Sequence, residues 1–261
     1  IPITAVLGDQ QASLFGQNCI SSGEVKNTYG TGCFALTNTG SEIVHSNNGL
    51  LSTVAFQIDG QAPQYALEGS VSIAGAAVQW LRDNLNIIKS SSEVESLAME
   101  VKDNGDVYFV PAFSGLFSPH WDETARGVLV GLSRFSNKSH IARAVLESVA
   151  YQSYELLESM EKDIGKSFES VNVDGGMVEN NLLMQFQSDI FNKKVISQEI
   201  NEITALGAGA ASYLYINNLP LKNMASLISQ SKSWNPNIDI KQRELNISKW
   251  NKAISKAKQW I

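Results

Sequence analysis

The stretch that most constrains the fold is the alternating run at residues 171–174, which leads directly into the glycine pair Gly175-Gly176. Alternating apolar and polar side chains predict a half-buried strand. Beyond the glycines, Asn180 or Asn181 is placed to cap a helix. A strand, two glycines and a helix N-terminus accept phosphate or adenosine, because no Cβ intrudes and free N–H groups face the ligand. Many α/β proteins carry such a turn without a ligand, so the pattern alone is only moderately specific for a site.

A second glycine turn, Gly30-Thr31-Gly32, separates predicted strands at residues 25–29 and 34–39. Such a turn can present backbone N–H groups and the Thr31 hydroxyl to phosphate oxygens. An ordinary hairpin also needs glycine at its turn. Both interpretations of this turn stay open from the local pattern.

The third glycine motif is Gly8-Asp9-Gln10. The apolar run before it, residues 3–7, predicts a core-type strand, and a helix is expected from Asp9 to about Gly16. Asp9 then lies at or near a helix N-terminus, where a carboxylate can cap free N–H groups. The same carboxylate could instead be a general base at the mouth of a cleft. The local pattern favours the cap.

The remaining periodic segments alternate between strands and helices. Strands are predicted at 50–58, 65–67, 107–110 and 195–198, and helices at 70–85, 93–101, 141–164, from a Thr204 cap onward, and around Trp250 to Ile261. Residues 112–134 are expected to be irregular. Gly75 lies inside the predicted helix 70–85, where a glycine indicates either close packing or the close approach of a ligand. Together these segments predict an α/β fold with one mixed sheet.

Composition limits the possible partners. The chain has 261 residues, a net charge of −6, and 43% hydrophobic residues. The acidic balance argues against nucleic acid as the main partner, and no apolar run approaches the roughly 20 residues that span a bilayer. Cys19 and Cys33 form neither metal nor redox spacing, which fits a cytoplasmic location. No linker divides residues 1–261, so one domain is expected, cut from a longer chain because it begins at Ile1 on a strand.

Several motifs, in order, resemble the C-terminal half of the glycerol kinase branch of the two-lobed FGGY carbohydrate kinases. They are Gly8-Asp9-Gln10-Gln11-Ala12, Asn27 to Phe34, Tyr65 to Gly69, Trp121-Asp122 with Ala125-Arg126-Gly127, Leu146-Glu147-Ser148 with Ala150-Tyr151-Gln152, and Val173-Asp174-Gly175-Gly176. The resemblance runs from Ile1 nearly to the end. It implies an actin-like ATPase (ribonuclease H-like) domain, with a mixed β-sheet flanked by helices, as the C-terminal lobe of a two-lobed kinase.

The resemblance also implies a role for each matching residue. Asp9 would be the catalytic base, Gln10 would hydrogen-bond glycerol, and Phe34 would lie against the carbon face of glycerol. The nucleotide site would comprise Thr31, Gly75, Gln79, Gly175, Gly176 and Asn180. No metal ligand is implied among them.

The implied reaction is ATP plus glycerol giving ADP plus sn-glycerol 3-phosphate. An aspartate is ionised at neutral pH, so Asp9 could accept the proton of the glycerol hydroxyl as the bond to the γ-phosphorus forms. Mg²⁺ and backbone N–H groups would carry the phosphate charge, and lobe closure would exclude water.

The resemblance is incomplete because the first lobe of the family has no counterpart here. That lobe supplies a further phosphate loop, an Asp near the metal, and the Arg-Glu pair and Tyr that hold glycerol. The chain alone is therefore expected to lack appreciable kinase activity, and the full-length protein to form a homo-oligomer. Two alternatives stay open: an FGGY kinase for another polyol or sugar such as xylulose or gluconate, and an actin-like nucleotide-binding module. Gln10 and the run from Tyr29 to Phe34 favour glycerol.

Overall fold

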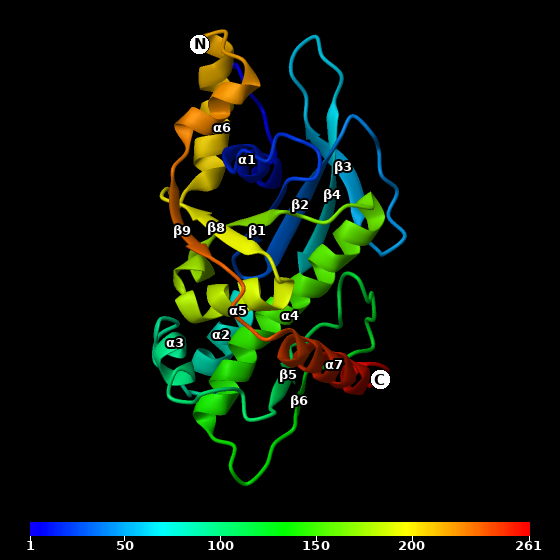
Figure 1. Ribbon diagram of the computed structural model, residues 1–261, viewed down its shortest axis with the longest axis vertical. Helices are drawn as coiled ribbons and strands as arrows, with labels where there is room; N and C mark the ends of the chain where they lie inside the picture. Colours follow the sequence, from blue (N-terminus) through cyan, green and yellow to red (C-terminus); the bar gives the residue numbers. More distant parts are fainter.

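The computed structural model describes all 261 residues apart from the side chains of residues 230 and 231. Within these residues the central sheet has seven strands in the order β3-β4-β2-β1-β7-β8-β9, and β5 and β6 form a separate pair (Figure 1). The strands are β1 (Val25–Tyr29), β2 (Cys33–Gly40), β3 (Leu51–Phe56), β4 (Gln64–Val71), β5 (Tyr108–Val110), β6 (Val128–Val130), β7 (Ser170–Asp174), β8 (Lys194–Gln198) and β9 (Gln230–Trp234).

Strand β1 lies at the point where the sheet changes direction. It pairs antiparallel with β2 and parallel with β7. Because neighbouring parallel strands end at the same edge of a sheet, the turns that follow Tyr29 and Asp174 lie side by side. The register confirms this, since Thr28 pairs with Asp174. The two glycine turns predicted from sequence therefore meet at one edge.

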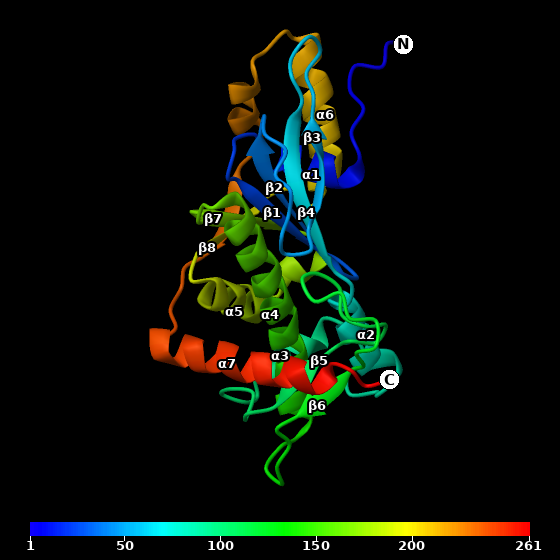
Figure 2. The same ribbon diagram turned by 90° about the vertical axis from the view of Figure 1, so that its right-hand side faces the viewer.

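Helices cover both faces of the sheet. They are α1 (Asp9–Gly16), α2 (Gly75–Asp83), α3 (Glu93–Ala98), α4 (Lys138–Ile164), α5 (Asn181–Phe191), α6 (Ile203–Ile216) and α7 (Ile240–Ala257), with the 3-10 helices η1 (Gly176–Glu179) and η2 (Leu221–Leu227). Helices α1 and α6 pack together near the N-terminus, whereas α2, α3, α4, α5 and α7 gather at the other end of the molecule (Figure 2). No helix in the part of the chain described here is long and apolar enough to cross a membrane.

The sheet separates two hydrophobic cores. Successive residues of a strand point to opposite faces: Ala35 belongs to the larger core, and Leu36 belongs to the smaller core around Leu14 and Phe15. Strand β4 divides in the same way between Ala66 and Leu67, Ala66 lying in the smaller core. The smaller core therefore holds α1 against the sheet, and the larger core holds the long helix α4.

Most predicted elements are confirmed. The helix that starts at Asp9, the strands flanking Gly30-Thr31-Gly32 and the helix behind Gly175-Gly176 all lie where the sequence predicts them. Gly165 ends α4 in the left-handed conformation with φ +64°. Asn180 is the N-cap of α5, because its Oδ1 accepts a hydrogen bond of 2.8 Å from the Leu183 N–H.

The predicted strand at residues 3–7 is wrong. Residues 1–8 form no strand, and the side chains of Ile3 and Val6 are each 84% exposed. An apolar run becomes a strand only when a neighbouring strand satisfies its backbone groups. The sheet, as far as the structure describes it, has no strand at this position.

Two further predictions need correction at their boundaries, and two strands were missed. The helix predicted at 70–85 starts only at Gly75, because Val71 still pairs with Cys33 in the sheet. Gly75 is therefore the first residue of α2 and not an interior glycine. Thr204 does not cap α6, whose N-cap is Glu202. Strands β6 and β9 were not predicted, since β9 has the polar sequence Gln-Ser-Lys-Ser-Trp and β6 lies in the segment expected to be irregular.

Candidate functional site: a glycine-lined cavity coupled to helix α1

A cavity of about 570 Å³ opens where the two glycine turns meet. The β1–β2 turn, the start of α2, helix α3 and η1 contribute its walls. Five of the predicted nucleotide residues line it together: Thr31, Gly75, Gln79, Gly176 and Asn180. The remaining one, Gly175, lies directly behind the wall, against the backbone of Tyr29.

Backbone contacts fix the first turn against helix α2. The carbonyl oxygen of Thr31 accepts hydrogen bonds from the N–H groups of Ala74 (2.9 Å) and Ala76 (3.1 Å), and the Gly75 N–H donates to the Gly30 carbonyl at 3.0 Å. A Cβ at Gly75 would lie 2.6 Å from that carbonyl oxygen. Gly75 therefore permits close packing and also forms part of the cavity wall, so both interpretations of this glycine have a structural basis.

The second turn depends on its two glycines in different ways. Gly175 has φ +94°, and a Cβ there would lie 2.3 Å from the Tyr29 carbonyl oxygen, so the turn requires glycine. A Cβ at Gly176 would meet no atom within 4 Å. A side chain at position 176 would thus leave the backbone unstrained and take up space in the cavity.

Asp9 is the first residue of α1 and is exposed. Its Oδ1 accepts a hydrogen bond of 2.8 Å from the N–H of Gln10, so the carboxylate does satisfy a backbone donor of the first turn. The N-cap of α1 is nevertheless Gly8, without a side-chain cap, so the helix cap predicted for Asp9 is not formed. The exposure of Asp9 leaves its carboxylate accessible to a ligand.

A buried lysine connects the residues predicted to hold glycerol. The Lys26 side chain on β1 is fully buried, and its Nζ donates to Gln10 Oε1, to Thr28 Oγ1 at 2.9 Å and to the Phe34 carbonyl oxygen at 3.2 Å. Gln10 and Phe34 are thereby brought together, although they are far apart in sequence. The Phe34 side chain is 39% exposed and lies outside the cavity wall.

A second set of hydrogen bonds ties α1 to the glycine pair. Ser13 Oγ on α1 and Nε2 of Gln17, the C-cap residue of that helix, each donate to Asp174 Oδ2 at 2.9 Å. Asp174 is buried and directly precedes Gly175. The helix that carries Asp9 and the turn that lines the cavity are therefore held as one unit.

The charge of Asp9 acts on two nearby groups, Lys26 and Glu68. Burial lowers the pKa of Lys26 to about 8, against the opposing charges of Asp174 and other nearby groups that include Asp9. Burial raises the pKa of Glu68, which the charge of Lys26 opposes and that of Asp9 reinforces. Sequence reasoning missed both residues. The available signal was a charged residue in the middle of an otherwise buried strand, as in Val25-Lys26-Asn27.

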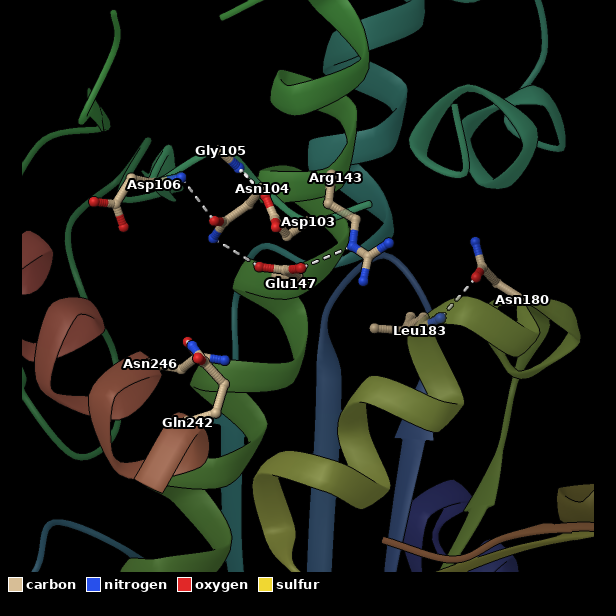
Figure 3. Close-up of polar contacts among 10 residues, drawn as sticks. All are labelled: Asp103, Asn104, Gly105, Asp106, Arg143, Glu147, Asn180, Leu183, Gln242 and Asn246. Atoms are coloured by element: carbon tan, nitrogen blue, oxygen red, sulfur yellow. Dashed lines mark hydrogen bonds and ion pairs between the residues drawn. The ribbon is translucent and has the colours of Figure 1, made fainter. Parts of the chain in front are cut away.

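A third polar group is centred on Glu147 of α4 (Figure 3). The buried carboxylate of Glu147 accepts hydrogen bonds from Arg143 Nε at 2.8 Å and Asn104 Nδ2 at 2.9 Å. Burial raises the pKa of Glu147 to about 7, which Arg143 and Asn104 oppose. The neighbouring Leu146 lines the cavity. Glu147 therefore fixes α4 to the loop at 103–106 and does not itself reach the cavity.

The residues that the structure describes include no group of three or more His, Cys, Asp or Glu side chains that could hold a metal ion. A smaller cavity of about 280 Å³ lies around Tyr154 and Arg243. Three of its charged groups, Glu158, Glu161 and Lys193, are already paired, for example Lys193 Nζ with Glu161 Oε1 at 2.9 Å, so it makes a weaker candidate site.

The sheet, the two adjacent glycine turns and the flanking helices define the class of protein, an α/β lobe of the actin-like type. Residues 25–213 match the C-terminal domain of the FGGY family of carbohydrate kinases. The chain belongs to this family.

Sequence and structure comparisons agree with that assignment. The whole chain is 52% identical to a glycerol kinase of Methylobacterium radiotolerans and 53% identical to one of Brucella anthropi, and it covers 52% of each. A crystal structure of Plasmodium falciparum glycerol kinase with ADP superposes with a TM-score of 0.93 at 39% identity, covering 98% of this chain and 51% of that one. A xylulose kinase of Lactobacillus acidophilus, 21% identical with a TM-score of 0.80, shares the fold. The chain thus spans about half the length of the curated relatives it matches.

Proposed function

We propose that the chain is the C-terminal half of a kinase that transfers the γ-phosphoryl group of ATP to glycerol, giving ADP and sn-glycerol 3-phosphate. One observation carries the proposal: a single cavity gathers Thr31, Gly75, Gln79, Gly176 and Asn180, and Asp174 ties its wall to the helix that bears Asp9. Glycerol kinases about half identical to the chain over its whole length support glycerol as the acceptor.

The cavity suits the nucleotide. Its glycine turns offer backbone N–H groups and the Thr31 hydroxyl to phosphate oxygens, and Gly176 leaves room for them. The Oδ1 atom of Asn180 caps α5, so its Nδ2 group supplies the donors for a ligand. Mg²⁺, when bound, would neutralise phosphate charge and would be held chiefly by the nucleotide itself. The ADP-bound relative from Plasmodium falciparum supports an adenine nucleotide as the ligand.

Asp9, Gln10 and Phe34 would serve the acceptor. A glycerol hydroxyl oxygen forms the new bond to the γ-phosphorus, the bond from that phosphorus to the bridging oxygen of ADP breaks, and the hydroxyl proton passes to the Asp9 carboxylate. The exposure of Asp9 leaves room for this contact. The exposed ring of Phe34 offers an apolar surface to the carbon chain.

The proposal includes partners outside the chain. A preceding N-terminal lobe would complete the glycerol and phosphate sites, which agrees with the chain covering half of its relatives. The free, buried thiols of Cys19 and Cys33 support a cytoplasmic location. Homo-oligomerisation of the full-length protein rests on the family resemblance alone.

The test is Asp9→Asn in the full-length protein. Turnover with glycerol should fall by about 10³-fold, because the proton acceptor is lost, whereas ADP affinity should stay within about twofold in titration calorimetry. Asp59→Asn is the matched control, since Asp59 is an exposed carboxylate in the β3–β4 turn. A variant at Asp9 that retains near-normal turnover would show that the protein is not a kinase of this mechanism.

A further inference from the structure

Each N–H donor of the Lys26 ammonium group has an acceptor within the protein. An ammonium group has three N–H donors and no acceptor, and its Nζ contacts three acceptors: Gln10 Oε1, Thr28 Oγ1 and the Phe34 carbonyl oxygen. Burying a lysine is costly, and an apolar side chain of similar size is often more stable in such a place. Stability alone therefore does not account for a charged residue here.

The contacts of Lys26 have a defined direction. Thr28 Oγ1 accepts from Lys26, so the Thr28 hydroxyl proton is available to Ser13 Oγ, 3.3 Å away. Ser13 in turn donates to Asp174 Oδ2 at 2.9 Å. The series starts at a group that can only donate and ends at a carboxylate that, when ionised, can only accept. Reversing any step would leave a buried group without its partner.

The same direction fixes the amide of Gln10. Its oxygen must face the lysine, because an amide NH₂ would place donor against donor. The Nε2 group of the same amide then faces away from Lys26, and Gln10, which follows Asp9 in α1, is only half-buried. The Phe34 backbone is held by the same ammonium group. One buried ammonium group thus fixes the orientation of the Gln10 amide and holds the backbone of Phe34, two of the three residues proposed to contact the acceptor.

We propose that Lys26 is a positioning residue that holds the Gln10 amide with its NH₂ group toward the acceptor, so that the site selects polyols with a hydroxyl oxygen at that point. This rests on the proposed function. A site with a fixed donor has a higher affinity for a polyol with a hydroxyl oxygen at that point than for an analogue that lacks it, because the analogue leaves the donor unpaired. Lys26 contributes to recognition of the acceptor without touching it, and it does not line the nucleotide cavity.

The experiment uses the full-length kinase and the variant Lys26→Met, which keeps the apolar stem and removes the charge. The KM for glycerol should rise about tenfold, as expected for one misdirected hydrogen bond, and the KM for ATP should stay within about twofold. Combining Lys26→Met with Gln10→Ala should raise the glycerol KM no further than Gln10→Ala alone, because the two residues act through one contact. Asn27→Ala is the control, since Asn27 is buried on the same strand and bonds to Ser153 instead.

A second variant covers the case in which Lys26→Met fails to fold. Gln10→Glu is isosteric and pairs with the Lys26 ammonium, but it has no N–H donor to offer the acceptor. It should match Gln10→Ala in its glycerol KM and keep normal ADP binding. A Gln10→Glu enzyme with wild-type glycerol KM would overturn the proposal, as would additive effects of Lys26→Met and Gln10→Ala or equal rises in both KM values. Wild-type turnover is measured first with glycerol, xylulose and gluconate, so an enzyme inactive on glycerol would refute the proposed function separately.

Discussion

At the scale of single residues, Glu147 gives the folding free energy a pH dependence. Its carboxylate is buried between Arg143 and Asn104, and burial raises its pKa to about 7 from an ordinary value of 4.5. Between these two values the folded state binds more protons than the unfolded state, so stability falls as pH rises through this window. The charged form is the less stable one in spite of its hydrogen bonds.

We expect Glu147→Gln to remove this dependence. From pH 5 to pH 7 the wild-type chain should lose stability relative to the variant, and above pH 7 the difference should level off. Urea denaturation at pH 5, 6, 7 and 8 measures it. Glu158→Gln on the same helix is the control, because Glu158 is 41% exposed and its pair with Lys162 is screened by solvent. A difference between wild type and Glu147→Gln that stays constant with pH would contradict the expectation.

The residues that sequence could predict are those whose motif is local. Thr31, Gly176 and Asn180 each stand in a short run that sets both the turn and the side chain, and the structure brings them to one cavity. Lys26 was missed because its contacts come from another helix and another strand, at Gln10 and Phe34. Its place in a buried strand, Val25-Lys26-Asn27, is a signal of burial, but the local sequence does not show which acceptors the ammonium group meets.

At the scale of elements, α1 and α6 are joined through glycine. A Cβ on Gly207 of α6 would lie 1.8 Å from the Ala12 carbonyl oxygen, and one on Gly16 of α1 would lie 2.4 Å from the Ile203 carbonyl oxygen. Both obstacles are backbone atoms, which cannot rotate away. This contact was not predicted, because pairing of helices distant in sequence leaves no periodic signal. The orientation of α1, and thus the position of Asp9, depends on this contact.

Gly207→Ala should therefore destabilise the chain by about 1–3 kcal/mol, a cost typical of overpacking. In the full-length enzyme it should also lower turnover, since α1 must move. Gly209→Ala is the matched control two residues away, because a Cβ there meets nothing within 4 Å. That variant should be unchanged or more stable by up to about 1 kcal/mol, from helix propensity. Urea denaturation compares the two, and equal effects at both positions would rule out the packing explanation.

At the scale of the whole molecule, the sheet separates the two parts of the proposed site. Helix α1 packs in the smaller core on one face of the sheet, and α4 packs in the larger core on the other face. Leu146 of α4 belongs to that larger core and also lines the cavity. Asp174 connects the two parts of the proposed site, because its strand ends at the edge where the glycine turns meet. The α/β class and order of elements could be predicted, since periodicity and turns are local. That residues 1–8 form no strand could not be predicted, because strand formation depends on which strands are neighbours.

The division of the site predicts what the 261-residue chain can do alone. It holds the glycine-lined cavity, so we expect it to bind ADP with a Kd on the order of millimolar, or about −4 kcal/mol. It lacks any second lobe to close over the acceptor and exclude water, so we expect no appreciable turnover of glycerol in a coupled assay. Titration calorimetry measures the binding, and Gly176→Ala serves as its control. The added methyl meets open space and should leave unfolding unchanged while weakening ADP binding, because it takes up room in the cavity. Absence of heat at millimolar ADP, or equal ADP binding by Gly176→Ala, would contradict a nucleotide site in this cavity. Near-full turnover of glycerol by the chain would show that one lobe is enough for catalysis.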